Sequence, residues 1–199
     1  MSIVVEHEKR RREILEKALN VFMEEGYEDV TLQKIADRCG ITRTTLYIYF
    51  KNKMDIFNFS IKQLLSAVEN DITEIRKKKE LTHPEKLIQV MDVIIERLEE
   101  NQPLLSVVLN YFLYIAKSDH DPSYRLRRRT VRLRHILTTM LIDGIKAGEF
   151  ARSLSVKDAN ELLYSLIEAA GFRLVVLHRS QVEEIKDSTK LVVQGFSKP

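Results

Sequence analysis

The chain has 199 residues, 44% of them hydrophobic, with a formal net charge of +3 and one cysteine. This length and hydrophobic content provide for a real core and argue against a disordered chain, while one cysteine excludes an intrachain disulfide or a cysteine metal cluster. Because no run of about 18 apolar residues and no secretory signal occurs, we expect a cytoplasmic protein without a membrane partner. The net charge by itself is only a weak indication of nucleic-acid binding.

The amphipathic pattern of the first predicted helix covers residues 9–22, and the helix is expected to end at Gly26. It begins with four consecutive cations at residues 9–12, which either flank a DNA groove or form a frayed, solvated helix end. The sequence leaves these two interpretations open.

A second, short helix is predicted to begin near Thr31. Ile35, Ala36 and Cys39 lie three or four residues apart and therefore share one buried face. Gly40 follows at the place where a helix commonly ends in a left-handed residue, so we expect a tight turn there. On this interpretation Cys39 contributes packing rather than chemistry.

A third helix starts after Ile41, with Thr42 as its N-cap and with Leu46 and Phe50 packing back on the second helix. Its outer face has hydrogen-bond donors, hydroxyls and aromatic rings rather than the usual mixture of glutamate and lysine. The residues of this face are Arg43, Thr44, Thr45, Tyr47 and Tyr49. Such groups suit base edges and phosphates in a DNA major groove.

The alternative is an ordinary helical hairpin whose polar residues face water. The order of the neighbouring elements favours DNA binding, because a long helix with Asn52 as a plausible cap follows directly. The predicted order is thus helix, helix, turn, helix, long helix, with an exposed polar face on the third helix.

These residues resemble the tetracycline-repressor (TetR) family of bacterial transcriptional regulators. The residues that carry the resemblance are Gly26-Tyr27, Thr31, Ile35-Ala36, Gly40-Ile41, Thr45-Leu46-Tyr47, Tyr49-Phe50 and Lys53, within residues 11–57. The chain departs from the family pattern at Cys39, where alanine is usual, and at Thr44, where glycine is frequent. The side chain of Thr44 would change the DNA-facing surface and therefore the operator.

The resemblance implies an all-α fold of about nine helices in two domains. Residues 1–52 form the three-helix, helix-turn-helix DNA-binding domain, and residues 53–199 form the ligand-binding and dimerisation domain. Lys53 corresponds to a lysine that family members place against the DNA backbone. The complete set of expected DNA contacts is Thr31, Gln33, Thr42, Arg43, Thr44, Thr45, Tyr47, Tyr49 and Lys53.

Further helices follow along the remainder of the chain, where hydrophobic residues recur at helical spacing. The fourth helix is predicted to end near Lys79, and Thr82 with Glu85 forms a capping box for the fifth. An apolar block at residues 104–116 precedes a turn cluster at residues 118–122 and a helix that ends at Gly148.

The last two predicted helices begin at the cap Ser155 and near Val182, and they are the expected dimer pair. The first of them has apolar residues on more than one stripe, so it is buried on two sides. The resemblance implies a four-helix bundle formed with the partner's copies, whereas the alternative is a monomer core. The expected interface residues are Leu162, Leu166, Ala169, Ala170, Leu174 and Val192.

Candidate ligand contacts are polar, aromatic or flexible residues that stand in apolar blocks, although each also fits a core or a surface position. These residues are Met91, Tyr111, Phe112, Tyr114, His135, Glu168 and Phe172. The arginine-rich residues 125–134 either attract an anionic ligand or form a solvated charged face.

The sequence therefore predicts a homodimeric, ligand-responsive regulator of transcription that binds a pseudo-palindromic operator, and the resemblance implies repression. We expect no enzyme, cofactor or metal site, because the five histidines lack metal-ligand spacing and no glycine-rich phosphate loop occurs. The alternative function is a helical protein-interaction module without DNA binding.

Overall fold

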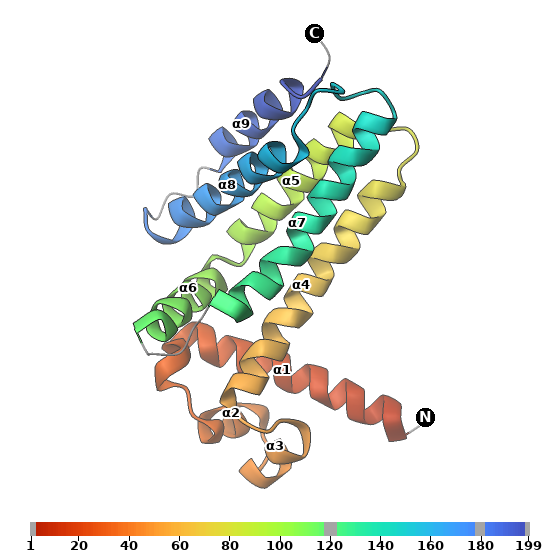
Figure 1. Cartoon of the computed structure of the whole chain (residues 1–199). Coiled ribbons are helices and arrows are strands. Elements are labelled where there is room, and N and C mark those ends of the chain that lie inside the picture. Colours follow the sequence, from red (N-terminus) through yellow and green to blue (C-terminus); the bar gives the residue numbers. More distant parts are fainter. Residues whose placement is uncertain (1–2, 118–122, 178–181, 198–199) are drawn as a thin grey trace. The chain divides into compact units, whose positions relative to one another are not determined.

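The computed structural model describes residues 3–117, 123–177 and 182–197; of these, the side chains of residues 3, 4, 63, 64, 112, 114–117 and 123–130 are not described. The described residues form nine helices and no extended strand (Figure 1). The helices are α1 (Ile3–Asp29), α2 (Leu32–Cys39), α3 (Arg43–Tyr49), α4 (Lys53–Lys77), α5 (His83–Glu100), α6 (Gln102–Lys117), α7 (Ser123–Lys146), α8 (Val156–Val175) and α9 (Glu183–Gln194). The predicted all-α fold is thus confirmed. None of the described helices is both long and apolar enough to span a membrane.

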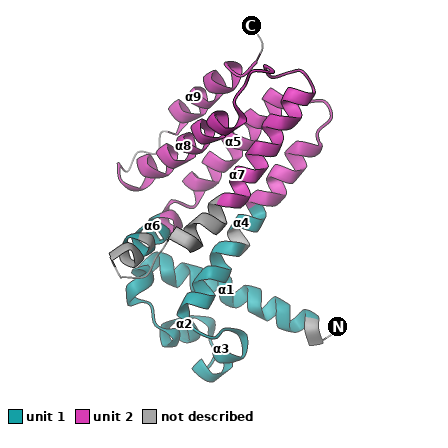
Figure 2. Cartoon of the chain, viewed as in Figure 1, with its two compact units in different colours: residues 1–67, 106–118 teal, residues 68–105, 119–199 magenta. Residues whose placement is uncertain are grey.

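The helices belong to two compact units, coloured separately in Figure 2. Unit 1 comprises residues 1–67 and 106–118, and unit 2 comprises residues 68–105 and 119–199. Helices α4 and α6 each contribute residues to both units. The contact-based division thus falls inside α4, whereas the functional boundary between residues 52 and 53 stays a prediction.

Unit 1 has a single core to which its five helical segments contribute. The first turns of α4 bury Ile56, Phe57 and Ile61 in it, and α6 adds Val107 and Tyr111. Four aromatic rings, of Phe22, Tyr27, Phe57 and Tyr111, contact one another with centroid separations of 4.3–5.9 Å. Because these rings come from α1, α4 and α6, they fix the three helices together.

The predicted turn between α2 and α3 is confirmed in its details. The Thr31 hydroxyl accepts a hydrogen bond from the Lys34 amide, and the Thr42 hydroxyl accepts one from the Thr45 amide. Gly40 has φ 67° and ends α2 in the left-handed conformation. The prediction for α1 was too short, because helical structure continues beyond Gly26 to Asp29 after a kink at which Gly26 has φ 78°.

Unit 2 is built around α5, which contacts α7, α8 and α9. Thr82 and Glu85 form the predicted capping box at its start, and Ser155 caps α8 as predicted. Met91 and Leu87 on α5 are fully buried, and Phe150, in the connection after α7, is buried in the same core. This core places the ends of α4, α5 and α7 beside one another, as Figure 1 shows.

Candidate nucleic-acid interface

The outer face of α3 is exposed and carries the polar groups that the sequence predicted. Leu46 is buried under the helix, whereas Arg43 and Thr44 are exposed and 47% of Tyr47 is accessible. A guanidinium nitrogen of Arg43 donates a hydrogen bond of 3.1 Å to the Tyr47 hydroxyl, and the guanidinium lies over the Tyr47 ring. Arg43 and Tyr47 thus form one preorganised donor group on a rigid helix.

Other predicted residues of this face are engaged within the chain. The hydroxyls of Thr42 and Thr45 are 2.9 Å apart, so they hydrogen-bond to each other. The half-buried ring of Tyr49 stacks on His7 of α1 at a centroid distance of 4.6 Å. Ile48, which was not among the predicted contacts, is 68% exposed between the two tyrosines in the sequence, and an exposed apolar side chain is of the kind that suits a thymine methyl.

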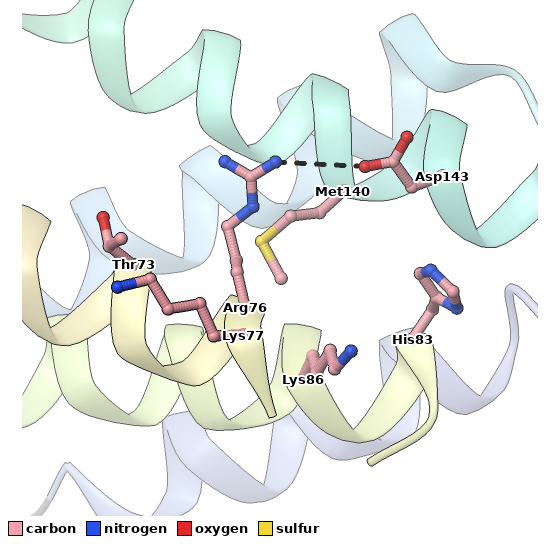
Figure 3. A pocket seen from close by; sticks show the side chains of 7 residues that line it. All are labelled: Thr73, Arg76, Lys77, His83, Lys86, Met140 and Asp143. Atoms are coloured by element: carbon pink, nitrogen blue, oxygen red, sulfur yellow. Dashed lines mark ion pairs between the residues drawn. The ribbon is translucent and has the colours of Figure 1, made fainter. Parts of the chain in front are cut away.

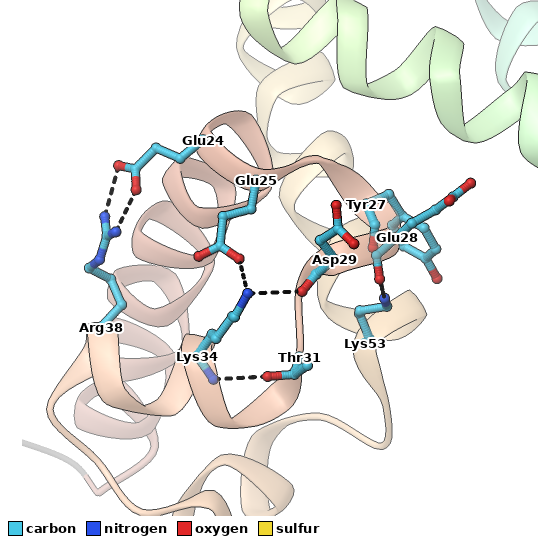
Figure 4. Close-up of polar contacts among 9 residues, drawn as sticks. All are labelled: Glu24, Glu25, Tyr27, Glu28, Asp29, Thr31, Lys34, Arg38 and Lys53. Carbon is cyan, nitrogen blue, oxygen red and sulfur yellow. Dashed lines mark hydrogen bonds and ion pairs between the residues drawn. The ribbon is translucent and has the colours of Figure 1, made fainter.

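Polar contacts tie α2 to α1 near both ends of α2 (Figure 4). Lys34 pairs with Glu25, and Arg38 forms two hydrogen bonds with the carboxylate of Glu24. The hydrogen bonds from Arg38 are the largest cause that lowers the pKa of Glu24. Gln33 donates to Asp37 at 2.8 Å. Because these cations are paired with acids of α1, they hold α2 in place, and they add little unpaired positive charge to the surface beside α3.

Lys53 has a structural role that the sequence did not reveal. Its ammonium donates to the backbone oxygens of Tyr27, at 2.7 Å, and Glu28, at 3.0 Å, and lies over the Tyr27 ring (Figure 4). Burial lowers the pKa of this ammonium. Lys53 therefore ties the start of α4 to the end of α1, and its contact with DNA phosphate stays a prediction.

The basic N-terminal residues are also partly engaged. Arg10 pairs with Glu13 at 3.0 Å, and the Arg11 guanidinium lies 4.1 Å from the centroid of the Phe59 ring. Lys9 and Arg12 are exposed. Two of the four cations at residues 9–12 thus remain in solvent, where they are available to a polyanion.

The predicted ligand contacts whose side chains are described have different surroundings. Met91 is buried in the core of unit 2, and Tyr111 is buried in the core of unit 1. The side chains of His135, Glu168 and Phe172 are exposed, and those of Phe112 and Tyr114 lie outside the described set. The aromatic spacing on α6 therefore serves packing, at least at Tyr111.

Five of the six predicted dimer residues lie on α8, where they divide between two faces, and Val192 lies on α9. Ala170 and Leu174 are buried within the chain, so their assignment to a surface is corrected. Leu162 and Ala169 are exposed, while Leu166 and Val192 are half-buried. Phe172 is 55% exposed and lies on the stripe of Leu162 and Ala169 rather than in a pocket. The outer stripe of α8, defined as Leu162, Ser165, Ala169, Phe172 and Val176, therefore has large apolar side chains in solvent.

The structure gives no support to a metal centre at the described residues, where no group of three or more histidine, cysteine, aspartate or glutamate side chains has a suitable arrangement. Cys39 is buried against α1, as its predicted packing role requires. Burial raises the pKa of its thiol, which opposes formation of a reactive thiolate.

Comparison with known proteins agrees with this geometry. Residues 14–58 match the family described as bacterial regulatory proteins, tetR family. A fatty acid metabolism regulator protein of Bacillus subtilis is 29% identical over 160 residues, which are 78% of each chain. The relatives are transcriptional regulators, which supports the prediction that the chain is not an enzyme.

Two solved structures share the fold over nearly the whole chain. A TetR transcription regulator from Haloarcula marismortui is 25% identical with a TM-score of 0.81, and the match covers 96% of this chain and 100% of that one. The regulator FadR from Bacillus subtilis, solved with stearoyl-CoA, is 26% identical with a TM-score of 0.75, over 92% of this chain and 98% of that one. The matching helix-turn-helix, the exposed polar face of α3 and the shared all-helical fold together show that the chain belongs to the tetR family of bacterial transcriptional regulators.

Proposed function

We propose that the protein is a homodimeric repressor whose two α3 helices bind successive major grooves of a pseudo-palindromic operator, and that a small effector releases it. The observation that carries the proposal is the exposed Arg43–Tyr47 pair on a helix whose other side is fixed by buried Leu46. The guanidinium can donate two hydrogen bonds to a guanine edge, which is the commonest specific contact in a major groove. In this role the protein works in the cytoplasm, where its operator is.

The outer stripe of α8 supports the homodimer. A single short helix buries too little surface for tight specific binding, whereas two related by a twofold axis contact half-sites about 34 Å apart. Phe172, Leu162 and Val176 are 55%, 45% and 53% exposed in the single chain. A second copy covers such a face symmetrically, because each stripe then packs on its own equivalent.

A fatty-acyl thioester is the proposed class of effector. The support comes from relatives, since one regulates fatty acid metabolism and another was solved with stearoyl-CoA. Helices α4 and α6 contribute to both compact units, so a ligand that favours one arrangement of these helices in unit 2 also acts on unit 1. The operator affinity then falls by the ratio of the effector's affinities for the two states.

Replacing Arg43 by alanine tests the DNA-binding face. We expect a loss of about 1–3 kcal/mol, or roughly 5- to 150-fold, on an operator selected from random DNA, with relaxed preference at one base pair. Fluorescence anisotropy with the operator and with its single-base variants measures both effects. Arg152→Ala, an exposed arginine in unit 2, is the matched control and should bind as the parent does. Equal loss on all DNA sequences would remove Arg43 from base recognition.

Replacing Lys53 by alanine separates phosphate binding from structural support. The loss of two hydrogen bonds to α1 should lower the free energy of unfolding by about 1–2 kcal/mol. If Lys53 also contacts a phosphate, specific and random DNA should bind more weakly alike, with a shallower salt dependence. Lys53→Arg keeps the charge and should restore the salt slope. A Lys53→Ala variant that is destabilised but keeps the parental slope has lost a structural contact only.

Salt dependence also decides between the proposed function and a helical protein-interaction module. Binding to DNA releases counterions and should weaken steeply as salt concentration rises. A protein that retards no duplex DNA at low ionic strength contradicts the proposed function.

A further inference from the structure

A cavity of about 280 Å³ lies in unit 2 where the ends of three helices meet (Figure 3). Its walls are Thr73, Arg76 and Lys77 near the end of α4, His83 and Lys86 at the start of α5, and Met140 and Asp143 on α7. All seven residues belong to unit 2, so the cavity is formed within one compact unit. None of them was among the predicted ligand contacts.

The walls of this cavity carry more positive than negative charge. Arg76, Lys77 and Lys86 contribute three cations against the one carboxylate of Asp143. The Arg76–Asp143 pair is long, at 3.9 Å, and both side chains are about 40% exposed, so the carboxylate holds the guanidinium weakly. Lys77 also pairs with Glu74 at 2.8 Å on the exposed side of α4. An excess of cations therefore remains toward the cavity.

The carboxylate of Glu149, a residue near the cavity but not among its walls, is engaged by His83. It accepts a hydrogen bond from the His83 amide, and its carboxylate is 3.2 Å from the His83 imidazole Nδ1. Burial acts to raise the pKa of Glu149, but the contacts with His83, together with the positive charge of Lys86, outweigh it and lower the pKa. Glu149 thus accepts the hydrogen bond at the start of α5. The Lys86 ammonium attracts this carboxylate but forms no hydrogen bond or ion pair with a described residue that would hold it away from a ligand.

The arrangement suits a phosphate group better than an apolar ligand. A guanidinium presents two parallel donors to phosphate oxygens, and two lysines add positive charges, Lys77 from the same helix and Lys86 from α5. The Thr73 hydroxyl on the wall already donates to the Glu69 backbone oxygen at 2.7 Å, so the donors for a phosphate are the guanidinium and the two ammonium groups. Met140 provides the one purely apolar side chain of the wall. The volume, about 280 Å³, is just below that of ligand pockets, which span roughly 300–1,000 Å³, and therefore suits a head group rather than a whole ligand.

We infer that this cavity binds the phosphate or diphosphate group of the effector. This inference rests on the proposed ligand response and narrows the class of effector to phosphate esters. In an acyl-coenzyme A the cavity holds nucleotide phosphates, and the acyl chain lies elsewhere. Residues 125–134, which the sequence left open as either an anion-attracting segment or a solvated charged face, are not needed for this role. Of its arginines with described side chains, Arg132 pairs with Glu69 and Arg134 with Glu161.

Calorimetric titration of the full-length protein tests the inference without DNA. The probes are pyrophosphate, adenosine 3′,5′-bisphosphate and octanoate, the last as a carboxylate without phosphate. We expect both phosphate compounds to bind and octanoate not to compete with them. Arg76→Gln and Lys86→Gln should each weaken phosphate binding about tenfold, the effect of one lost charge-assisted hydrogen bond.

Lys157→Gln is the matched control, because it removes the same charge from an exposed site on α8 away from the cavity walls. It should bind the phosphate probes as the parent does, and thermal unfolding should confirm that all variants are folded. No binding of either phosphate probe, equal weakening by the control, or competition by octanoate alone would overturn the inference.

Operator release is measured separately, with palmitoyl-CoA added to the complex of protein and operator. Phosphate binding that depends on Arg76 but brings no release supports the cavity and contradicts the proposed ligand response. Release that is equal in parent and Arg76→Gln supports the ligand response and contradicts the cavity.

Discussion

Replacing Phe172 by glutamate is expected to convert the protein to a monomer and to weaken operator binding by about a hundredfold or more. The side chain lies in the middle of the outer stripe of α8 and is 55% exposed in the single chain. In a twofold dimer each new carboxylate would be buried beside its own equivalent, and an unpaired buried charge costs several kcal/mol. Binding by one half-site alone forfeits most of the specific affinity.

Sedimentation equilibrium gives the oligomeric state, and titration of the operator gives the affinity. Because Phe172 is exposed in the single chain, the variant should keep its helix content. Val131→Glu is the matched control, since Val131 is 60% exposed on α7 and is not part of the outer stripe of α8. A Phe172→Glu variant that remains dimeric and keeps the parental operator affinity would exclude the α8 stripe as the interface.

The sequence was most informative where a structure depends on neighbouring residues. The cap at Thr42, the left-handed turn at Gly40 and the capping box of Thr82 and Glu85 all form as predicted. Each involves residues within four positions of one another, so a short stretch of sequence is enough to predict it. The exposed face of α3 follows in the same way, since burial of Leu46 fixes which side of the helix faces outward.

Contacts between distant segments were not readable in this way. Apolar residues on two stripes of α8 predicted two buried sides, but nothing in the periodicity says which stripe packs within the chain. Ala170 and Leu174 prove internal, and Leu162 and Phe172 external. The backbone contacts of Lys53 and the convergence of Arg76 and Lys86 depend on how separate helices pack. Such sites can be identified only from the tertiary structure, because their residues lie on separate helices and have no characteristic separation in the sequence.

Phe150, in the connection after α7, is expected to contribute strongly to the packing of unit 2. Its side chain is fully buried. Its ring packs edge-to-face on that of Phe196, with 6.1 Å between the ring centroids. The following residue, Ala151, donates a hydrogen bond to the Phe196 oxygen. Phe150→Ala removes the ring and leaves a cavity, which should lower the free energy of unfolding by about 3–5 kcal/mol.

Gly144 gives this prediction a second, independent test. A Cβ built on Gly144 would lie 2.3 Å from Cδ2 of Phe150 and 3.2 Å from Cβ of His83, so the glycine makes room for the ring. Gly144→Ala should therefore lower the free energy of unfolding by about 1–3 kcal/mol through overpacking. Urea denaturation at one fixed protein concentration measures each variant, because dimerisation makes the apparent stability depend on concentration.

The double variant distinguishes direct packing from two unrelated losses. If the alanine methyl clashes with the ring, it costs little once the ring is gone, and Gly144→Ala with Phe150→Ala should be about as stable as Phe150→Ala alone. The two changes are then coupled by about the full effect of Gly144→Ala. Additive losses would mean that Gly144 is required for some other reason, such as its contact with His83, and that Phe150 does not fill the space above it.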